Sequence, residues 1–363
     1  MPERGPPVKV NASGFSLTLR LRTPIFSTMS FESTAKALST SNAPAEILVT
    51  RFKAIGDIVF TLPAVHALRD NFPDSRITFF TSKENEPLIR GFVDVKDIIT
   101  IDRTAFHRGQ VVTIVRETCS LLRSLRRKKF SLAIDFQNYG ETALLTWLTR
   151  APLRLGSLYN RGRALAYTAG IQRDYSIHPV DWNLLLLQKG GVRIDSVRNE
   201  FILPATAQSE AREVFSRLKL VPNKPTVFIQ PFTSAAHKDW PFANYLALAN
   251  EMRNRGAQVL FSGGPNQRAA LEPANREGFA VSAGPPLLVT AGLMQLSTMV
   301  IGGDTGFVHL ATALKKRVFC LAASIRPEPY GHKDWKIEPP GGSNMAGLAV
   351  STILDACNQA LAK

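Results

Sequence analysis

The residues with the clearest chemical potential lie late in the chain, at Asp304, Thr305, Gly306 and His309. The apolar run before them, 296–301, predicts a strand, and the apolar spacing after Gly306 predicts a helix. The first N–H groups of a helix and its dipole favour a bound phosphate. Thr305 could donate a hydroxyl hydrogen bond, Gly306 would admit the anion, and His309 could aim a ring nitrogen at the same corner. An ordinary strand-to-helix turn, with Asp304 or Thr305 as N-cap, explains this stretch alone equally well.

A second group of charged residues follows the first predicted strand, 47–52. Arg51 and Lys53 lie at its end, and Asp57 begins the predicted helix. The helix dipole and the two cations favour a carboxylate at this corner. Ligands in α/β folds bind beyond the carboxyl ends of strands, which is where these three side chains would project, although Asp57 could simply be a helix N-cap.

A third group follows a predicted strand at 226–230. Thr233 and Ser234 lie at the end of this strand and Lys238 in the same loop, and Gln267 follows the next predicted strand, 258–262. Polar loops at strand ends of this kind border a cleft in α/β folds.

These groups all follow strands that alternate with helices, a pattern that predicts an α/β fold with parallel sheets. The alternation runs through the first part of the chain, weakens over 151–205 and then restarts, so two α/β halves should face each other across a cleft. The expected divisions are a flexible extension at 1–45, halves at 46–205 and 206–344, and a final helix at 345–363.

Composition supports a globular protein. The chain has 363 residues, of which 45% are hydrophobic and 20% charged, and no apolar run is long enough to span a membrane. The three cysteines, Cys119, Cys320 and Cys357, are too far apart for a disulfide framework or a zinc site. A reducing cytoplasm is the expected compartment.

The formal net charge of +15 predicts an anionic partner, which could be a nucleic acid, an acidic lipid surface or a phosphorylated substrate. Basic residues are concentrated at 103–130, in a segment of helical character with an apolar face. The favoured interpretation is an amphipathic helix whose charged side faces water, although a helix that rests on anionic headgroups would have the same sequence pattern. Nucleic acid is disfavoured because stacking aromatics do not alternate with these cations.

Three segments carry a family resemblance. They are the run Arg-Phe-Lys-Ala-Ile-Gly-Asp-Ile-Val-Phe-Thr-Leu-Pro at 51–63, the pair at 233–234 with Lys-Asp-Trp-Pro at 238–241, and Asp-Thr-Gly-Phe-Val-His-Leu-Ala at 304–311. In this order they resemble glycosyltransferase family 9, over about residues 46–335. The resemblance implies a GT-B architecture of two Rossmann-like domains, an N-terminal one that binds the acceptor and a C-terminal one that binds a nucleotide sugar.

The resemblance also implies an inverting transfer of heptose from ADP-heptose to a hydroxyl of a lipopolysaccharide inner-core glycolipid. Asp57 would be the base, Lys238 would neutralise the leaving diphosphate, and Asp304 would contact the sugar. Other implied contacts are Arg51 and Lys53 to the acceptor, and Thr233, Ser234, Gln267, Thr305, Gly306 and His309 to the donor. No metal or cofactor is implied, and the expected protein is a monomer at the inner face of the cytoplasmic membrane, with no nucleic acid bound.

Two departures from the family pattern leave alternatives open. Gln267 stands where many members have a glutamate for the ribose, and the run at 321–325 lacks the usual glycine. Another nucleotide sugar, another surface glycan, an epimerase reaction, or a non-enzymatic anion-binding or nucleic-acid-binding role therefore remain alternatives. An NAD oxidoreductase is disfavoured because no Gly-x-Gly-x-x-Gly follows the first strand.

Overall fold

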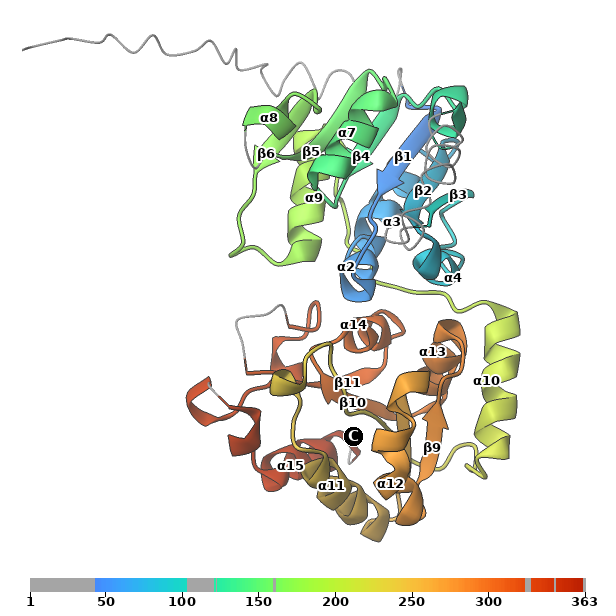
Figure 1. Ribbon diagram of the computed structural model, residues 1–363, viewed down its shortest axis with the longest axis vertical. Helices are drawn as coiled ribbons and strands as arrows, with labels where there is room; N and C mark the ends of the chain where they lie inside the picture. The colour runs from blue at the N-terminus through green and yellow to red at the C-terminus, as the bar shows by residue number, and fades with distance from the viewer. Residues whose placement is uncertain are drawn as a thin grey trace, which may run out of the picture.

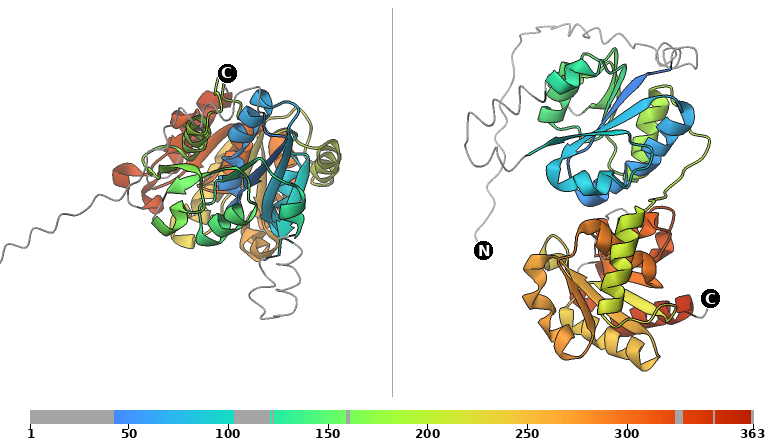
Figure 2. Two further views of the ribbon diagram at one scale, coloured as in Figure 1. Left: turned by 90° about the horizontal axis from the view of Figure 1, so that it is seen from above. Right: turned by 90° about the vertical axis from the view of Figure 1, so that its right-hand side faces the viewer.

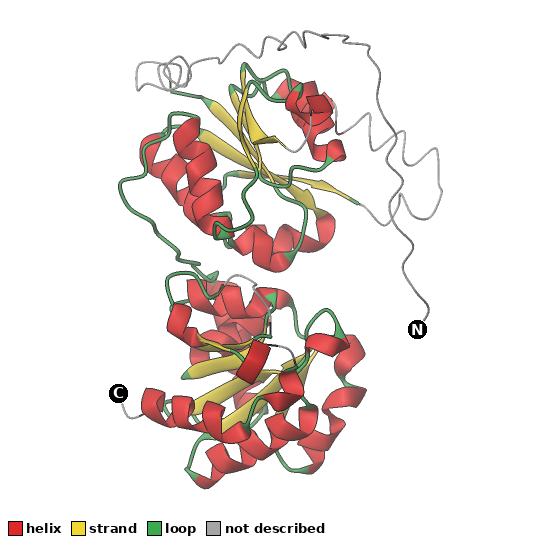
Figure 3. Cartoon of the chain, turned by 90° about the vertical axis from the view of Figure 1, so that its left-hand side faces the viewer, coloured by secondary structure: helices red, strands yellow, loops and turns green. Residues whose placement is uncertain are grey.

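The computed structural model describes residues 43–102, 121, 123–158, 161–323, 328–342 and 344–361. The chain forms two α/β halves, one above the other along the long axis (Figure 1). In each half, helices cover both faces of a parallel sheet (Figure 3). The predicted α/β class with two parallel sheets is confirmed.

The sheet of the first half has the strand order β3-β2-β1-β4-β5-β6, and all its strand pairs are parallel. In this order β1 and β4 are neighbours although they are distant in sequence. The crevice beyond such a switch point is where ligands bind in open α/β sheets. The strands are β1 (Glu46–Thr50), β2 (Arg76–Ser82), β3 (Asp97–Ile101), β4 (Leu132–Asp135), β5 (Leu153–Leu158) and β6 (Ala169–Gln172).

Helices cover this sheet because successive strand residues are buried on opposite faces. Ile47 and Val49 of β1 join one apolar cluster and Leu48 joins another. Helices α3 and α9 contact each other over the first cluster, and Leu145 of α7 packs on the second. The helices are α2 (Ile55–Val59), α3 (Leu62–Asn71), α4 (Glu86–Ile89), α7 (Gly140–Leu148), α8 (Arg161–Ala164) and α9 (Pro179–Lys189).

The second half repeats the topology, with the order β12-β11-β10-β7-β8-β9 and a switch point between β7 and β10. Its strands are β7 (Thr226–Gln230), β8 (Gln258–Gly263), β9 (Ala280–Ala283), β10 (Met299–Gly303), β11 (Arg317–Leu321) and β12 (Lys336–Ile337). Its helices are α10 (Ala205–Arg217), α11 (Phe242–Asn254), α12 (Glu272–Arg276), α13 (Leu287–Leu296), α14 (Gly306–Ala313) and α15 (Val350–Leu361). The final helix α15 packs on α11, within this half.

The alternation of strands and helices does not weaken over 151–205 as expected, since β5, α8, β6 and α9 lie there. Glycines at this spacing are typical of loops, but close packing requires Gly156 and Gly170 inside strands. A Cβ at Gly156 would lie 2.4 Å from the Tyr167 ring, and one at Gly170 would lie 2.3 Å from the carbonyl oxygen of Gly156. The helix expected from Asp57 onward is also interrupted, because α2 ends at Val59 and α3 begins at Leu62.

An extended linker, 190–204, joins the halves along the outside of the molecule (Figure 2, right). Two adjacent linker residues bond to different halves. The Glu200 carbonyl accepts a 3.0 Å hydrogen bond from His66 Nε2 of α3, and the Phe201 amide donates a 2.9 Å bond to the Ala313 carbonyl at the end of α14. The linker is thereby fixed to both halves near their contact.

Some predictions fall outside the described residues. These include nearly all of the extension 1–45, Cys119, most of the basic segment 103–130 and part of the run 321–325. Over the ranges that the structure does describe, no helix is long and apolar enough to cross a membrane.

Candidate functional site

A cavity of about 1300 Å³ is lined by both halves. The first half contributes the start of α2 and the segment before α9. The second half contributes the ends of β7, β8 and β10 and the start of α14. The cavity thus lies at the carboxyl ends of the strands, where the alternation of strands and helices predicted a ligand site.

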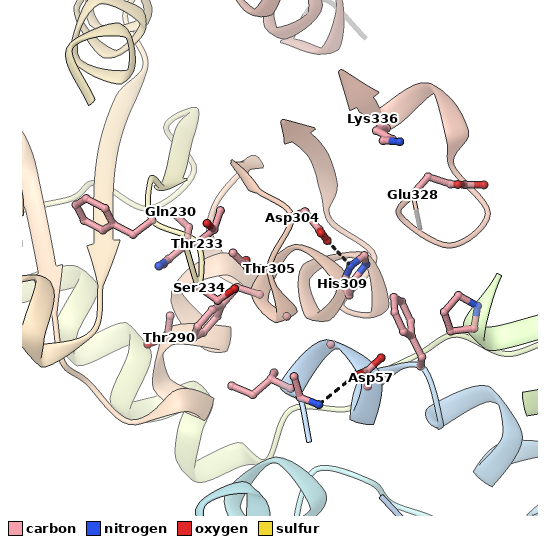
Figure 4. A pocket seen from close by; sticks show the side chains of 18 of the residues that line it. Asp57, Gln230, Thr233, Ser234, Thr290, Asp304, Thr305, His309, Glu328 and Lys336 are labelled. Carbon is pink, nitrogen blue, oxygen red and sulfur yellow. Dashed lines mark hydrogen bonds and ion pairs between the residues drawn. The ribbon is translucent and has the colours of Figure 1, made fainter. Parts of the chain in front are cut away.

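Asp57 lines the first-half wall of this cavity, at the third position of α2. Its Oδ2 lies 2.7 Å from Arg51 Nη2 and accepts a 3.1 Å hydrogen bond from the Ala54 amide (Figure 4). Both contacts use Oδ2, which leaves Oδ1 to accept from a ligand. The side chain of Asp57 is 42% exposed, so a ligand can reach it.

The loop that carries Asp57 is fixed by buried polar groups from neighbouring strand ends. Gln137, which follows β4, accepts hydrogen bonds through Oε1 from the amides of Phe52 (3.0 Å) and Lys53 (3.2 Å). Asn85 and Ser82 donate to the Phe52 carbonyl at 2.6 and 2.7 Å. Since three side chains satisfy this one turn of backbone, the position of α2 is well determined.

Asp135, the last residue of β4, holds the loop that carries Gln137. Its carboxylate accepts from the amides of Gln137 and Asn138, both at 2.9 Å, and from the Tyr167 hydroxyl at 2.8 Å. Complete burial raises the pKa of Asp135, while these hydrogen bonds oppose the rise. The residue therefore orders the loop after β4 from outside the cavity lining.

The second-half wall is the strand-to-helix corner of β10 and α14. Thr305 is the N-cap of α14, yet its side chain makes no capping bond, and its buried Oγ1 has no partner among the described residues. His309 is buried, with Nε2 3.4 Å from Asp304 Oδ1, and over the same residues Nδ1 has no partner (Figure 4). A buried hydroxyl and ring nitrogen without partners are costly unless a ligand satisfies them.

The two walls touch at a pair of glycines. A Cβ at Gly306 would lie 2.7 Å from the Gly56 amide nitrogen, and one at Gly56 would lie 3.2 Å from His309 Cδ2. The structure therefore explains Gly306 through contact between the halves. Its predicted role in admitting an anion stays a prediction.

The loop after β7 places Thr233 and Ser234 in the cavity lining, but not Lys238. Lys238 ends the short 3-10 helix η3 (Ala236–Lys238). The Thr233 hydroxyl donates to the Ala235 carbonyl at 3.0 Å, and its amide donates to Asp239 Oδ1 at 2.7 Å. Because the hydroxyl proton of Thr233 is already used, this residue can offer a ligand only an acceptor.

Gln267 also lines the cavity, within a turn that follows β8. Its Oε1 accepts a 2.8 Å hydrogen bond from the Gly264 amide. This bond orients the side chain and leaves the Nε2 amide protons for a ligand.

Arg51 and Lys53 lie outside the cavity lining. Arg51 binds Asp57, and its Nε donates to the Lys53 carbonyl at 3.0 Å. The Lys53 ammonium lies 5.8 Å from the centre of the Tyr139 ring. The cations that do line the cavity, Arg173, Lys333 and Lys336, were missed from the sequence because they are far from the motifs.

Sequence reasoning also missed Gln230, the last residue of β7. It lines the cavity, is 4% exposed and has no partner for its Oε1. An amide at the carboxyl end of a central strand was the available signal, although burial at a switch point is needed to recognise it.

Aromatic side chains of the first half close the cavity on another side. The Phe60 ring lies 4.4 Å from that of His309 and 5.1 Å from that of His178, measured between centroids. His178 Nδ1 accepts from the Val180 amide, and Nε2 donates to the Glu328 carbonyl at 3.1 Å. Burial lowers the pKa of His178, which favours this neutral ring with its proton on Nε2. A second bond between the halves joins the Tyr330 hydroxyl to Asp181 Oδ1 at 2.7 Å.

Across the described ranges, no group of three His, Cys, Asp or Glu side chains is arranged to hold a metal ion. The site instead combines the carboxylates of Asp57, Asp181, Asp304 and Glu328 with several hydroxyl and amide groups and a helix N-terminus. This set can bind a phosphorylated ligand and accept a proton from a second molecule.

The sequence profile of glycosyltransferase family 9 (heptosyltransferase) matches residues 118–337. A lipopolysaccharide core heptosyltransferase of Haemophilus influenzae, OpsX, is 22% identical over 313 residues, which are 81% of this chain and 84% of OpsX. This similarity extends beyond the segments quoted above to most of both chains.

Solved structures agree. The glycosyl transferase family 9 protein of Veillonella parvula matches with a TM-score of 0.76 at 19% identity, covering 88% of this chain and 97% of that protein. Escherichia coli heptosyltransferase WaaC with ADP matches with a TM-score of 0.73 at 18% identity, covering 87% and 99%. The fold is thus the GT-B arrangement of two Rossmann-like domains. Because the profile covers more than half of its length, this chain belongs to glycosyltransferase family 9.

Proposed function

We propose that this chain transfers heptose from ADP-heptose to a hydroxyl group of a lipopolysaccharide inner-core glycolipid, with inversion at the anomeric carbon. One observation carries the proposal. The carboxylate of Asp57 and the N-terminal corner of α14 line the same cavity from opposite halves, with Gly56 and Gly306 in contact. A base and an anion site are thereby held on two sides of the space for a sugar.

In the proposed reaction the acceptor hydroxyl gives its proton to Asp57, and its oxygen attacks the anomeric carbon. The bond to the diphosphate breaks on the opposite face, so the configuration inverts and ADP leaves with the bonding electrons. Arg51 holds Asp57 Oδ2 at 2.7 Å, which orients the carboxylate with Oδ1 toward its proton donor. The base gains mainly from this positioning.

The charge that grows on the diphosphate would be stabilised by the amides at the start of α14 and by the Thr305 hydroxyl. Lys238 needs to enter the cavity to add its ammonium to these donors. A shift of the loop after β7 on donor binding would bring it in. These groups act without a metal ion in the proposed mechanism.

The donor is proposed from the relatives, which include an OpsX heptosyltransferase and WaaC solved with ADP. For the ribose we propose the free Nε2 of Gln267. For a hydroxyl of the ribose or sugar we propose the unpartnered Oε1 of Gln230, since that atom needs a hydrogen-bond donor. Asp304 remains the proposed contact to the sugar.

Calorimetric titration with ADP-heptose and with UDP-sugars tests this proposal. We expect ADP-heptose to bind, and Lys238→Ala to weaken binding by about tenfold as one charge-assisted contact is lost. The anomeric configuration of the product, read by NMR, tests inversion, and excess chelator tests the absence of a metal. Preference for a UDP-sugar would change the donor only. Epimerised donor without acceptor would identify an epimerase instead, and a chain that binds no nucleotide sugar would refute the transferase.

A further inference from the structure

Large apolar side chains are exposed on one face of the first half. Leu144 and Trp147 of α7 are 55% and 53% exposed, and Leu165, just after α8, is 80% exposed. Helices α7 and α8 contact each other and lie side by side (Figure 1). Neighbouring exposed apolar groups of this size commonly mark an interaction site.

Their outward direction follows from helical spacing. Ala143 and Thr146 of α7 are buried against the half, whereas Leu144 and Trp147, three residues apart, share the opposite side. A surface helix normally carries polar residues on that side. Here a leucine and a tryptophan, each more than half exposed, occupy it.

Unpaired cations lie beside this apolar strip. Leu121 and Leu125 of the basic segment join the apolar cluster against which Leu145 of α7 packs, so both elements cover one face of the sheet. The exposed cations of this face are Arg123, Arg126 and Arg127, together with Arg150 at the end of α7. Within the described ranges, no carboxylate forms an ion pair with any of them.

The start of α7 lies close to the loop that carries Asp57. Tyr139, the residue before α7, is 43% exposed, and its ring faces the Lys53 ammonium at 5.8 Å. Lys53 is in the loop that carries Asp57. Since α7 leads from the carboxyl end of β4 back to the start of β5, Trp147 and Arg150 lie toward the opposite edge of the sheet from the cavity.

We propose that this face, defined by Leu144, Trp147, Arg150 and Arg123, Arg126 and Arg127, docks on an anionic lipid bilayer. A tryptophan and a leucine can enter the headgroup region while arginines pair with acidic headgroups. Such a surface would hold the protein on the bilayer that carries its glycolipid acceptor, and in this respect the inference rests on the proposed function. Nucleic acid is a poorer match because Leu144 offers no stacking face.

Co-sedimentation of the full chain with phosphatidylcholine vesicles, with or without phosphatidylglycerol, tests the inference. We expect binding to require the anionic lipid. Replacing Arg123, Arg126 and Arg127 by Gln should weaken it by about a hundredfold, given roughly fivefold for each cation near such a surface. Leu144→Ser with Trp147→Ser should weaken it by about tenfold.

Matched controls come from the second half. Val221 is 55% exposed, like Leu144, and Arg212 and Arg217 of α10 are exposed. A Val221→Ser variant, and a variant with Arg212→Gln and Arg217→Gln, should therefore bind the vesicles as the wild type does. Thermal unfolding verifies that every variant is folded. Equal loss in the controls, unchanged binding of the α7 variants, or no preference for anionic lipid would each overturn the inference.

ADP-heptose titration without vesicles separates this inference from the proposed function. The face variants should bind the donor as the wild type does, because none of their residues lines the cavity. A chain that binds vesicles through this face but binds no nucleotide sugar would keep the docking surface and refute the transferase. A chain that binds the donor but not vesicles would support the transferase and refute the docking surface.

Discussion

The two halves of this protein carry the same strand order but prepare their ligand corners in different ways. At the end of β1, Asp57 and its loop are held by Arg51 and Gln137. At the end of β10, Thr305 Oγ1 and His309 Nδ1 have no partner in the part of the chain that the structure describes, and neither has Gln230 Oε1 in the same cavity lining. The backbone of the first corner is held by protein groups, whereas the second corner leaves buried polar atoms for a ligand. The same topology therefore supports two different walls. We call the corner of Asp57 the rigid wall, because protein groups fix its backbone, and the corner of Thr305 and His309 the receptive wall, because its buried polar atoms are available to a ligand.

The largest expected effect concerns the rigid wall. Asp57→Asn should lower kcat by about a thousandfold, because the amide cannot take the acceptor proton, while the affinity for donor changes little. Steady-state kinetics together with donor titration measure the two effects separately. Asp181→Asn is the control, since it also lines the cavity and its amide oxygen can still accept from Tyr330. A variant at 57 that keeps a tenth of the wild-type kcat would remove the carboxylate from the mechanism.

Gln137→Leu should come next in size. It leaves the amides of Phe52 and Lys53 without an acceptor, which should lower the free energy of unfolding by about 2–4 kcal/mol. Urea denaturation measures this loss. Gln137→Glu retains an acceptor and should retain most of the stability, and Gln188→Leu, at an exposed position of α9, should change it little. An unaffected Gln137→Leu variant would mean that the first corner is not held in this way.

Gly306→Ala tests the contact between the walls. The added methyl would meet backbone and Ile55 of the opposite half at 2.7 Å, so we expect a loss of about 1–3 kcal/mol in stability and a lower kcat. Gly347→Ala is the matched control, because nothing lies within 4 Å of its added Cβ. Equal stability of the two variants would show that the halves do not need to approach so closely.

The smallest expected effect concerns the receptive wall, where a substitution should lower donor affinity without lowering the melting temperature. Thr305→Val removes a buried hydroxyl that has no partner in the free protein, so the melting temperature should stay the same or rise. Donor affinity should instead fall by about fivefold to tenfold, or about 1 kcal/mol, as a hydrogen bond to the ligand is lost. If melting temperature and affinity fell together, the Thr305 hydroxyl would already be satisfied in the free protein.

Local patterns in the sequence were sufficient for the fold class and for both corners. The strand-turn-helix pattern around Asp57 and around Thr305 is contained in about a dozen residues, and the structure places both in one cavity. Thr233, Ser234, Gln267, Asp304, Gly306 and His309 also line it. Lys238 and the pair Arg51 and Lys53 do not.

The remaining features depend on contacts between distant parts of the chain. Gln230 matters because burial leaves its amide without a partner, and Phe60 matters because it meets His309 of the other half. The glycines at 156 and 170 are needed in strands because neighbouring atoms fill the space of a side chain. Apart from the amide at the end of a strand at Gln230, none of these relations has a local signature in the sequence.

The attachment of the linker gives α14 a mechanical role. Phe201 is bonded to the last residue of this helix, and the corner at Thr305 precedes its first residue. With eight residues, α14 is about 12 Å long, and this distance separates the contact with Phe201 from the corner at Thr305. A rotation of the halves by about 10° around Phe201 would move the corner by roughly 2 Å at that radius. Under the proposed function, such a rotation would loosen or tighten the contacts between this corner and a donor.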